Sequence, residues 1–168
     1  MKKLLILIFT TLFFNSFSYA DKNMKIGSKG NLNEVSRIIK VKMYDNYYEP
    51  SEFKIKKNET IKFVVYNYGE LVHEFNIATK KMHLKHQPEM MRMVENEILL
   101  VDRIDRKKMK EMSKKDHSMS HSHSNSVLLE PNQSAELIWK FSTDASLEAA
   151  CNVPGHYDVG MIAKINNL

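Results

Sequence analysis

The stretch that decides the fold is CNVPGHYDVGM, residues 151–161, near the C-terminal end of the chain. It places the Cys151 thiol, the His156 imidazole and the Met161 thioether five residues apart in one loop. The proline–glycine pair at its centre predicts a tight turn that holds Cys151 and His156 near each other. Two imidazoles and one thiolate around copper, with a distant thioether, make a blue-copper centre. The loop therefore offers three of the four donors of such a centre.

The fourth donor has to come from elsewhere in the chain, and His73 is the candidate because a predicted strand follows a turn there. Each residue alone has a simpler explanation. A lone Cys or Met is usually a buried apolar side chain, and a lone His is usually a satisfied surface or core group. Cys151 is the single cysteine of the sequence. A free thiol is a liability in an oxidising compartment, so the combination favours a metal site.

Short β-branched and aromatic runs separated by turns indicate an all-β domain. The predicted strands cover 37–43, 53–55, 61–66, 72–78, 127–129, 135–141, 147–151 and 161–165. Seven or eight short strands at this spacing predict an antiparallel sandwich or barrel. The pattern breaks over 80–125, which is predicted to be a partly helical insertion with a helix start at Pro88.

The loop closely resembles the ligand loop of cupredoxins, the small blue-copper proteins. Residues 45–50, 57–60 and 67–75 resemble the secreted copper-tolerance branch of that family. The resemblance implies a cupredoxin-like Greek-key β-sandwich with His73 at one end of a sheet, next to the final loop. It also implies one type 1 copper ion with His73, Cys151 and His156 as equatorial ligands and Met161 as the axial ligand.

Three positions depart from the family pattern, of which Asn58 in place of a common Gly is a compatible change in a turn. Many electron-carrying cupredoxins have Asn or Ser directly after the first histidine, where it helps to lock the cysteine loop, whereas this chain has Glu74. The sequence therefore does not define which groups surround Cys151. The redox potential and the colour of the site depend on those groups, so the sequence does not define them either. Tyr47 stands where related copper-tolerance proteins often carry Met, so any extra ligand there is lost.

The insertion is the second unusual feature, because seven of the 11 Met and five of the seven His lie within 82–123. Apolar residues recur at helical steps from Met90 to Ile104 and predict one helical face. Thioethers and imidazoles suit copper, but a Met stripe is equally expected as core packing. The polar tract over 117–126 is either a solvated linker or a site of metal capture, for copper or zinc. The secondary donors that we single out are His83, His86, Met90, Met93, His117, Met119, His121 and His123.

The N-terminal 20 residues read as a cleaved signal peptide, with a basic start, an apolar stretch too short to span a bilayer and a small-residue cleavage site. A flexible arm is expected over 21–36 and the cupredoxin domain over 37–168. The net charge of +5 is small for a nucleic-acid binder, and Lys2 and Lys3 contribute two of these charges. We therefore expect a periplasmic protein without nucleic acid and without a membrane anchor.

By resemblance, the chain is a secreted copper-binding protein for copper tolerance, with copper ions and a periplasmic redox or copper-transfer protein as partners. The alternative is a small blue-copper electron carrier that uses the insertion for docking. An electron carrier has no need of so many donors in one insertion, which favours tolerance. We expect no enzyme: a multicopper oxidase needs several His-x-His pairs and a second cupredoxin domain, and the sequence has one such pair, His121-Ser122-His123.

Overall fold

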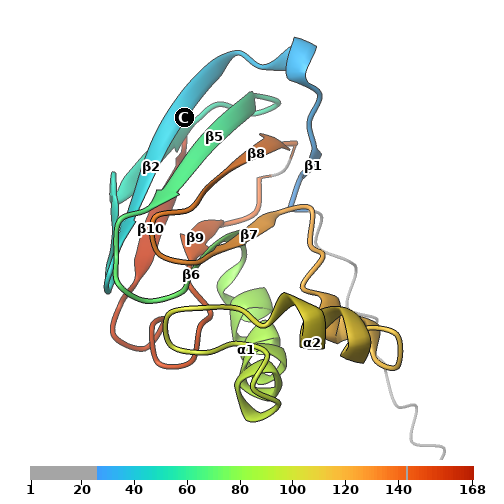
Figure 1. Ribbon diagram of the computed structural model, residues 1–168. Helices are drawn as coiled ribbons and strands as arrows, with labels where there is room; N and C mark the ends of the chain where they lie inside the picture. The colour runs from blue at the N-terminus through green and yellow to red at the C-terminus, as the bar shows by residue number, and fades with distance from the viewer. Residues whose placement is uncertain (1–25, 143) are drawn as a thin grey trace, which may run out of the picture.

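The computed structural model describes residues 26–142 and 144–168. They form two five-stranded sheets that face each other as a sandwich (Figure 1). The first sheet has the order β1-β8-β5-β2-β3 and the second the order β4-β10-β9-β6-β7. The strands are β1 (Ser28–Lys29), β2 (Arg37–Tyr44), β3 (Tyr47–Glu49), β4 (Glu52–Ile55), β5 (Thr60–Asn67), β6 (His73–Ala78), β7 (Ser126–Leu129), β8 (Ser134–Lys140), β9 (Glu148–Ala150) and β10 (Ile162–Asn167). The expected β-sandwich is thus confirmed, with two or three more strands than the seven or eight predicted. The antiparallel arrangement is only partly correct, because β2 pairs with β5 and β10 pairs with β4 in parallel.

The core lies between the sheets because alternate side chains of each strand point to the same face. In β5, Ile61, Phe63 and Val65 are fully buried and face the second sheet. Phe53, Phe63 and Phe75 contact one another pairwise, with ring centroids 5.3 to 6.1 Å apart. Burial of these rings supplies much of the energy that holds the sheets together.

Strand β6 differs from the others because all six of its residues are buried. Phe75 and Ile77 belong to the core between the sheets. Glu74 and Asn76 point to the opposite face, where side chains of the insertion cover them. The insertion therefore gives β6 two buried faces, and the polar residues on the second face are accommodated because side chains of the insertion form hydrogen bonds with them.

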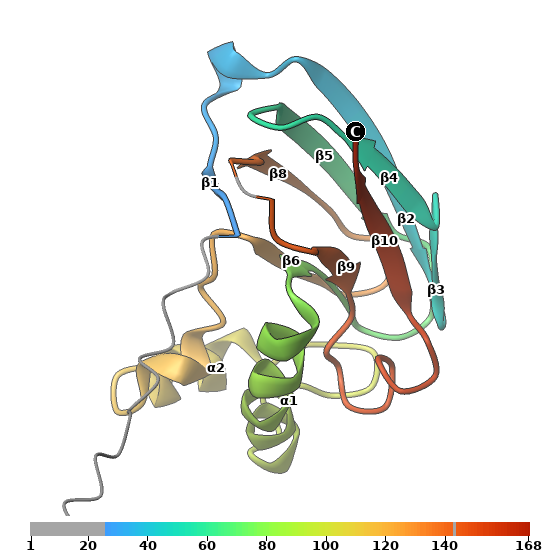
Figure 2. The ribbon, with the colours of Figure 1, turned by 180° about the vertical axis from the view of Figure 1, so that it is seen from behind.

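The insertion between β6 and β7 contains α1 (Lys80–Glu95), α2 (Arg106–Met112) and the 3₁₀ turn η2 (His117–Ser120). It packs at one end of the sandwich, beside the loop that joins β9 to β10 (Figure 2). Buried apolar side chains hold it there: Val72, Met90, Met93, Ile98, Leu99, Ile104 and Met119.

The predicted helix start at Pro88 is wrong, because α1 begins eight residues earlier and contains Pro88 in its interior. The helix starts where the Thr79 hydroxyl accepts a hydrogen bond from the Met82 amide. It ends at Glu95, so the helical face predicted as far as Ile104 is also wrong. Leu99 and Ile104 pair instead as an extended bridge, and their apolar side chains follow the helical spacing only by chance.

The signal peptide predicted over 1–20 lies outside the described residues. The expected arm is not loose from residue 26 onward, since β1 pairs with β8 and the Trp139 indole donates a hydrogen bond to the Ile26 carbonyl. Among the described residues, no helix combines the length and the apolar character that crossing a membrane requires.

Candidate metal centre

The two strands β6 and β9 are neighbours in the second sheet, and this adjacency builds the site. His73 is the first residue of β6, and Cys151 directly follows the last residue of β9. The chain then turns back through His156 to Met161 before β10 begins. The Met161 amide donates to the His156 carbonyl and the Cys151 amide donates to the Met161 carbonyl, which closes the loop. Gly155 and Gly160 have positive φ angles of 88° and 92°, which glycine adopts without strain.

Three donor atoms converge at this place: Nδ1 of His73, Nδ1 of His156 and Sγ of Cys151. The two nitrogens are 3.2 Å apart, and the sulfur lies 4.0 Å from the first and 3.4 Å from the second. Three donors bonded to one ion at typical metal–nitrogen and metal–sulfur lengths would be about 3.5 to 3.7 Å apart. The described side chains thus already have the spacing that one metal ion requires, and two imidazoles with a thiolate are the donors that copper prefers.

Asp45 fixes the orientation of the first imidazole, a role that the sequence did not reveal. Its carboxylate accepts a hydrogen bond from Nε2 of His73 at 2.8 Å and further ones from the amides of Glu70 and Leu71. An ionised carboxylate can only accept, so Nε2 carries the proton and Nδ1 keeps its lone pair. Carboxylates commonly orient metal-binding histidines in this way.

Gly69 makes room for this pair. A Cβ at residue 69 would lie 2.7 Å from Nε2 of His73 and closer still to the Asp45 carboxylate. Any larger residue there would have to displace the hydrogen-bonded pair. The position therefore requires glycine for space, and this requirement is invisible without the fold.

Burial sets the protonation of the donors in the metal-free protein. It raises the pKa of the Cys151 thiol to about 12. It also lowers the pKa of His73, against the opposing effect of Asp45, and lowers the pKa of His156. At neutral pH the site therefore presents two neutral imidazoles and a protonated thiol, and a cation that binds there has to displace the thiol proton.

Met161 is fully buried in the same core cluster as Cys151. Its backbone bonds to both Cys151 and His156 hold it at the end of the loop. Its place in the loop is compatible with a role as a weak fourth donor, and that role stays a prediction.

The chain is 40% identical over 146 residues to the copper-resistant cuproprotein CopI of Pseudomonas aeruginosa, an alignment that covers 79% of this chain and 76% of the relative. The chain belongs to the CopI family. It is also 27% identical over 146 residues to CopI of Rubrivivax gelatinosus, covering 86% of this chain and 74% of that protein. CopI of Vibrio cholerae is 33% identical over 111 residues, which cover 66% of this chain and 52% of that protein. No family model matches the sequence.

Solved structures agree on the fold. Auracyanin from Roseiflexus castenholzii matches with a TM-score of 0.56 and 17% identity, over 80% of this chain and 98% of that one. Auracyanin B matches with a TM-score of 0.59 and 12% identity, over 84% of this chain and 96% of that one. These likenesses confirm that this CopI-family chain has the cupredoxin fold.

Glu74 turns out to lock the cysteine loop of this CopI-family chain, although it replaces the Asn or Ser of other cupredoxins. Its backbone amide donates a hydrogen bond to Sγ of Cys151 at 3.3 Å. Its carboxylate accepts from the amide and the side chain of Asn152, at 3.2 and 2.7 Å. A fully buried carboxylate in β6 therefore holds the cysteine loop, where a neutral residue was expected to do so.

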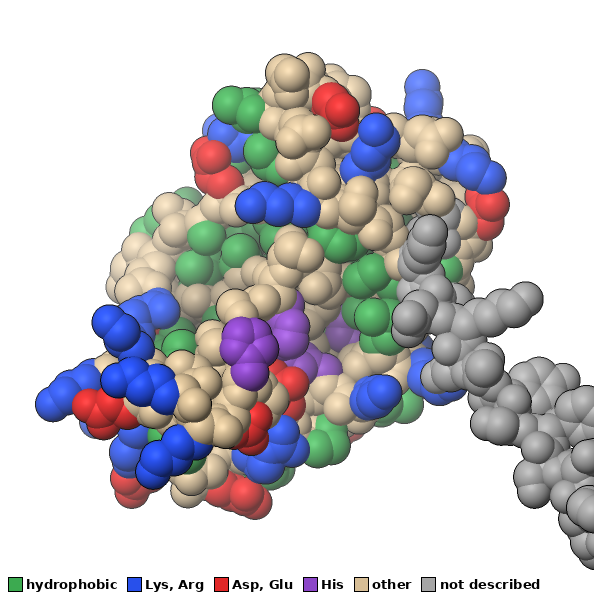
Figure 3. Space-filling view, turned by 90° about the vertical axis from the view of Figure 1, so that its right-hand side faces the viewer, with side chains coloured by type: hydrophobic (Ala, Val, Ile, Leu, Met, Phe, Trp, Pro, Cys, Tyr) green, Lys and Arg blue, Asp and Glu red, His purple; other side chains and the backbone are tan. Residues whose placement is uncertain are grey.

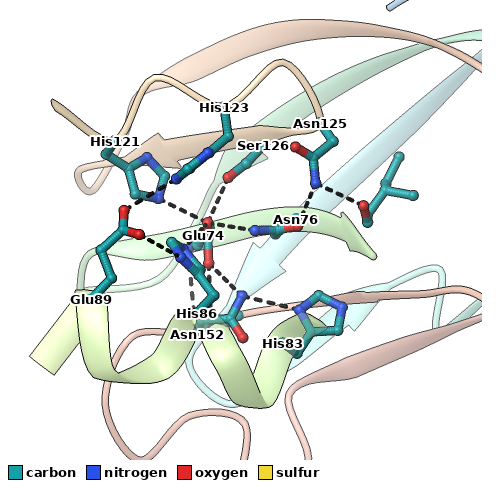
Figure 4. Close-up of polar contacts among 12 residues, drawn as sticks. Glu74, Asn76, His83, His86, Glu89, His121, His123, Asn125, Ser126 and Asn152 are labelled. Atoms are coloured by element: carbon teal, nitrogen blue, oxygen red, sulfur yellow. Dashed lines mark hydrogen bonds and ion pairs between the residues drawn. The ribbon is translucent and has the colours of Figure 1, made fainter. Parts of the chain in front are cut away.

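The structure brings three of the predicted secondary donors together: His86, His121 and His123 (Figure 4). They gather around two carboxylates that the sequence analysis did not single out as ligands, those of Glu74 and Glu89. Figure 3 shows histidine side chains clustered on one face of the molecule, with acidic side chains beside them.

The remaining predicted secondary donors lie elsewhere. Met90, Met93 and Met119 are buried in the apolar cluster of the insertion, and these positions indicate a packing role. Buried His83 lies against the Asn152 side chain and the Glu148 carbonyl. His117 is exposed and belongs to none of the donor groups found among the described residues.

Proposed function

We propose that this chain is a secreted, periplasmic type 1 copper-binding protein that serves copper tolerance. The observation that carries the proposal is the convergence of two imidazole nitrogens and one thiol sulfur within 4.0 Å, in a chain whose relatives are copper-resistant cuproproteins. In this proposal His73, Cys151 and His156 hold the ion and Met161 is the axial ligand. Further copper ions bind among the donors of the insertion.

The bound copper would supply one-electron chemistry, and the protein's own groups prepare its site. Asp45 keeps the proton of His73 on Nε2, away from the ion. The Glu74 amide points its N–H at the sulfur, which stabilises negative charge on a thiolate. Burial of His73 and Cys151 excludes water and limits exchange of the ion.

Secretion is proposed from the signal peptide predicted over 1–20 and from the chemistry of the thiol. The single cysteine is fully buried and unpaired. A buried thiol with a pKa of about 12 is protected from oxidation until a metal ion binds. This protection keeps the metal-free protein able to bind copper in an oxidising compartment.

Copper tolerance is tested by growth. A copper-sensitive bacterial host that exports the wild-type chain is expected to grow at higher copper concentrations than a host that exports Cys151→Ser at the same level. Equal growth of the two hosts would contradict the proposal. Immunoblots of periplasmic fractions would check both the export and the matched levels.

Electron transfer remains the second candidate function, and an apolar pocket next to His156 favours it. The pocket is about 410 Å³ in volume, and Leu71, Leu100, Val153 and Pro154 contribute to its lining. A redox partner could dock there close to the imidazole. The copper stoichiometry separates the two functions: tolerance predicts more than one copper ion per chain, and an electron carrier holds one.

Proton release is expected when copper binds. At pH 7.5 the imidazoles are already neutral and the Cys151 thiol is protonated, so binding of one Cu²⁺ should release about one proton and copper affinity should rise about tenfold per pH unit. Titration calorimetry in two buffers of different ionisation enthalpy measures this number. Cys151→Ser should release none. Wild-type binding without proton release would show that the thiol is not a ligand.

Replacing the axial donor should change the potential more than the affinity. Met161→Leu replaces a weak donor with an apolar group, which disfavours the more highly charged Cu²⁺ relative to Cu⁺, so the reduction potential should rise by roughly 60 mV, a tenfold change in the equilibrium. Redox titration of the copper-loaded protein measures the shift. Met43→Leu is the matched control, because it also removes a fully buried thioether from the same core. Equal potentials in wild type and Met161→Leu would refute the axial assignment.

A further inference from the structure

We propose that Glu74, His86 and His121, with Glu89 and His123 beside them, form a second site for a divalent transition-metal ion, and that Glu74 couples this site to the Cys151 centre. This inference deepens the proposed function, which places further metal ions among the donors of the insertion. Binding of an ion at the second site does not need copper at Cys151, whereas the coupling does and therefore rests on the proposed function.

The side chains come from β6, from α1 and from the segment that follows η2, and they meet above β6 (Figure 4). Nε2 of His121 lies 2.9 Å and Nε2 of His86 lies 3.3 Å from the same carboxylate oxygen of Glu74. On its other side the His86 ring faces Glu89, with Nδ1 3.5 Å from the carboxylate. The ligand atoms of each set of three, one around Glu74 and one around Glu89 with His123, lie within 4.8 Å of one another. His86 belongs to both sets through different ring nitrogens, so the proposed ion lies with Glu74, His121 and Nε2 of His86, while Glu89 and His123 lie beside it.

The inner part of this cluster is buried. The side chain of Glu74 is fully buried, that of His121 is 4% exposed and that of His86 is 11% exposed. The buried Nε2 atom of His86 makes no hydrogen bond within the described part of the chain, although it lies near Glu74. The Glu74 carboxylate already accepts hydrogen bonds from Asn76, Ser126 and Asn152. The unsatisfied group is therefore the buried imidazole nitrogen of His86, which is costly and which a metal ion would satisfy.

The electrostatics favour a cation there. The fully buried Glu74 carboxylate lies 2.9 Å from Nε2 of His121 and 3.3 Å from Nε2 of His86. Glu89 places a second carboxylate at the rim. The site thus offers two carboxylates and three imidazoles to an incoming ion, which would displace any proton that the ligating imidazoles carry.

The donor set selects the kind of ion. It contains imidazole nitrogen and carboxylate oxygen and no sulfur, which suits divalent zinc or copper better than soft Cu⁺. The buried methionines of the insertion pack in its apolar cluster. Zinc is the more useful probe because it has no redox chemistry and no colour of its own.

The coupling passes through one residue. Glu74 donates its backbone N–H to the Cys151 sulfur, while its carboxylate holds the two nitrogens of Asn152 and also faces the histidines. An ion bound to this carboxylate would add positive charge beside the copper centre and pull on the loop that follows Cys151. Positive charge disfavours Cu²⁺ relative to Cu⁺, so occupancy of the second site should raise the copper potential. By reciprocity, reduction of the copper should tighten zinc binding.

Zinc titration of the full chain carrying one equivalent of copper tests the site. Zinc affinity is measured by competition with a chromophoric chelator in wild type, His86→Gln, His121→Gln and the control His117→Gln. Since loss of even an outer-shell partner costs about 10- to 100-fold in affinity, His86→Gln and His121→Gln should each weaken zinc binding at least about tenfold. The exposed His117 should have no effect. Equal weakening by all three variants, or no zinc bound by wild type, would overturn the site.

The same titration of the Cys151→Ser chain separates this result from the fate of the proposed function. In this background too, adding His86→Gln should abolish the tight binding of one zinc ion per chain. This result does not depend on whether Cys151 is a copper ligand in the wild type. Coupling is read from the visible band and the potential of the copper-loaded wild type as zinc is added. Both should shift in wild type and stay constant in His86→Gln. A copper band that is present but insensitive to bound zinc would overturn the coupling and leave the site standing.

Discussion

The copper-loaded Cys151→Ser protein is expected to lack the intense visible absorption that the wild type acquires on binding Cu²⁺. Such a band arises from charge transfer between a thiolate sulfur and copper, and Cys151 is the only cysteine of the sequence. Serine is close in size and its hydroxyl can still accept the Glu74 amide hydrogen bond. The variant therefore removes the sulfur donor with little change in shape.

The expected size of this effect is complete loss of the band. Copper affinity should also fall by several factors of ten, because the remaining imidazoles of His73 and His156 lack the negatively charged donor. Circular dichroism of the metal-free proteins checks that the variant keeps the fold. An unchanged band in Cys151→Ser would place the copper elsewhere.

Removing the carboxylate of Asp45 should give the second largest effect. Asp45→Ala frees the His73 ring to rotate and to change tautomer, and it leaves the amides of Glu70 and Leu71 without their acceptor. Loss of such a partner typically costs about 10- to 100-fold in metal affinity. Competition with a chelator measures the affinity for Cu²⁺.

Two further variants make the Asp45 result specific. Asp144→Ala removes the same charge from an exposed residue that pairs with Lys57, so copper affinity should stay at the wild-type value. Gly69→Ala leaves Asp45 in place but crowds it and His73, so it should weaken copper binding as Asp45→Ala does. Wild-type affinity in both Asp45→Ala and Gly69→Ala would show that the orientation of His73 does not matter.

The fold and the meeting of His73, Cys151 and His156 were predictable because most of their signals are local. Cys151, His156 and Met161 share one loop, and the strands around it have clear alternation. His73 could be named because a turn and a strand meet there. In the structure β6 and β9 are neighbours, which brings His73 to Cys151 as expected.

The supporting residues could not be predicted because their contacts join distant parts of the chain. Asp45 lies 28 residues from His73, in the turn between β2 and β3. Glu74 looked like a departure from the family pattern, since its partners Asn152, His86 and His121 come from three separate segments. A residue type alone does not tell whether a carboxylate is solvated or buried in a network.

The insertion shows the limits of composition as a signal. Its methionines and histidines form one dense group in the sequence, but the fold separates them. Met90, Met93 and Met119 enter an apolar cluster, while His86, His121 and His123 meet around carboxylates. The helical spacing was also misleading beyond Glu95, because the apolar residues that follow pack from an irregular segment.

X-ray absorption at the copper K edge of the protein loaded with one equivalent of copper tests the central claim most directly. The account predicts a coordination shell with one thiolate sulfur and two imidazole nitrogens, from Cys151, His73 and His156. A shell of nitrogen and oxygen atoms without sulfur would contradict it and would assign the first copper ion to the histidines of the insertion.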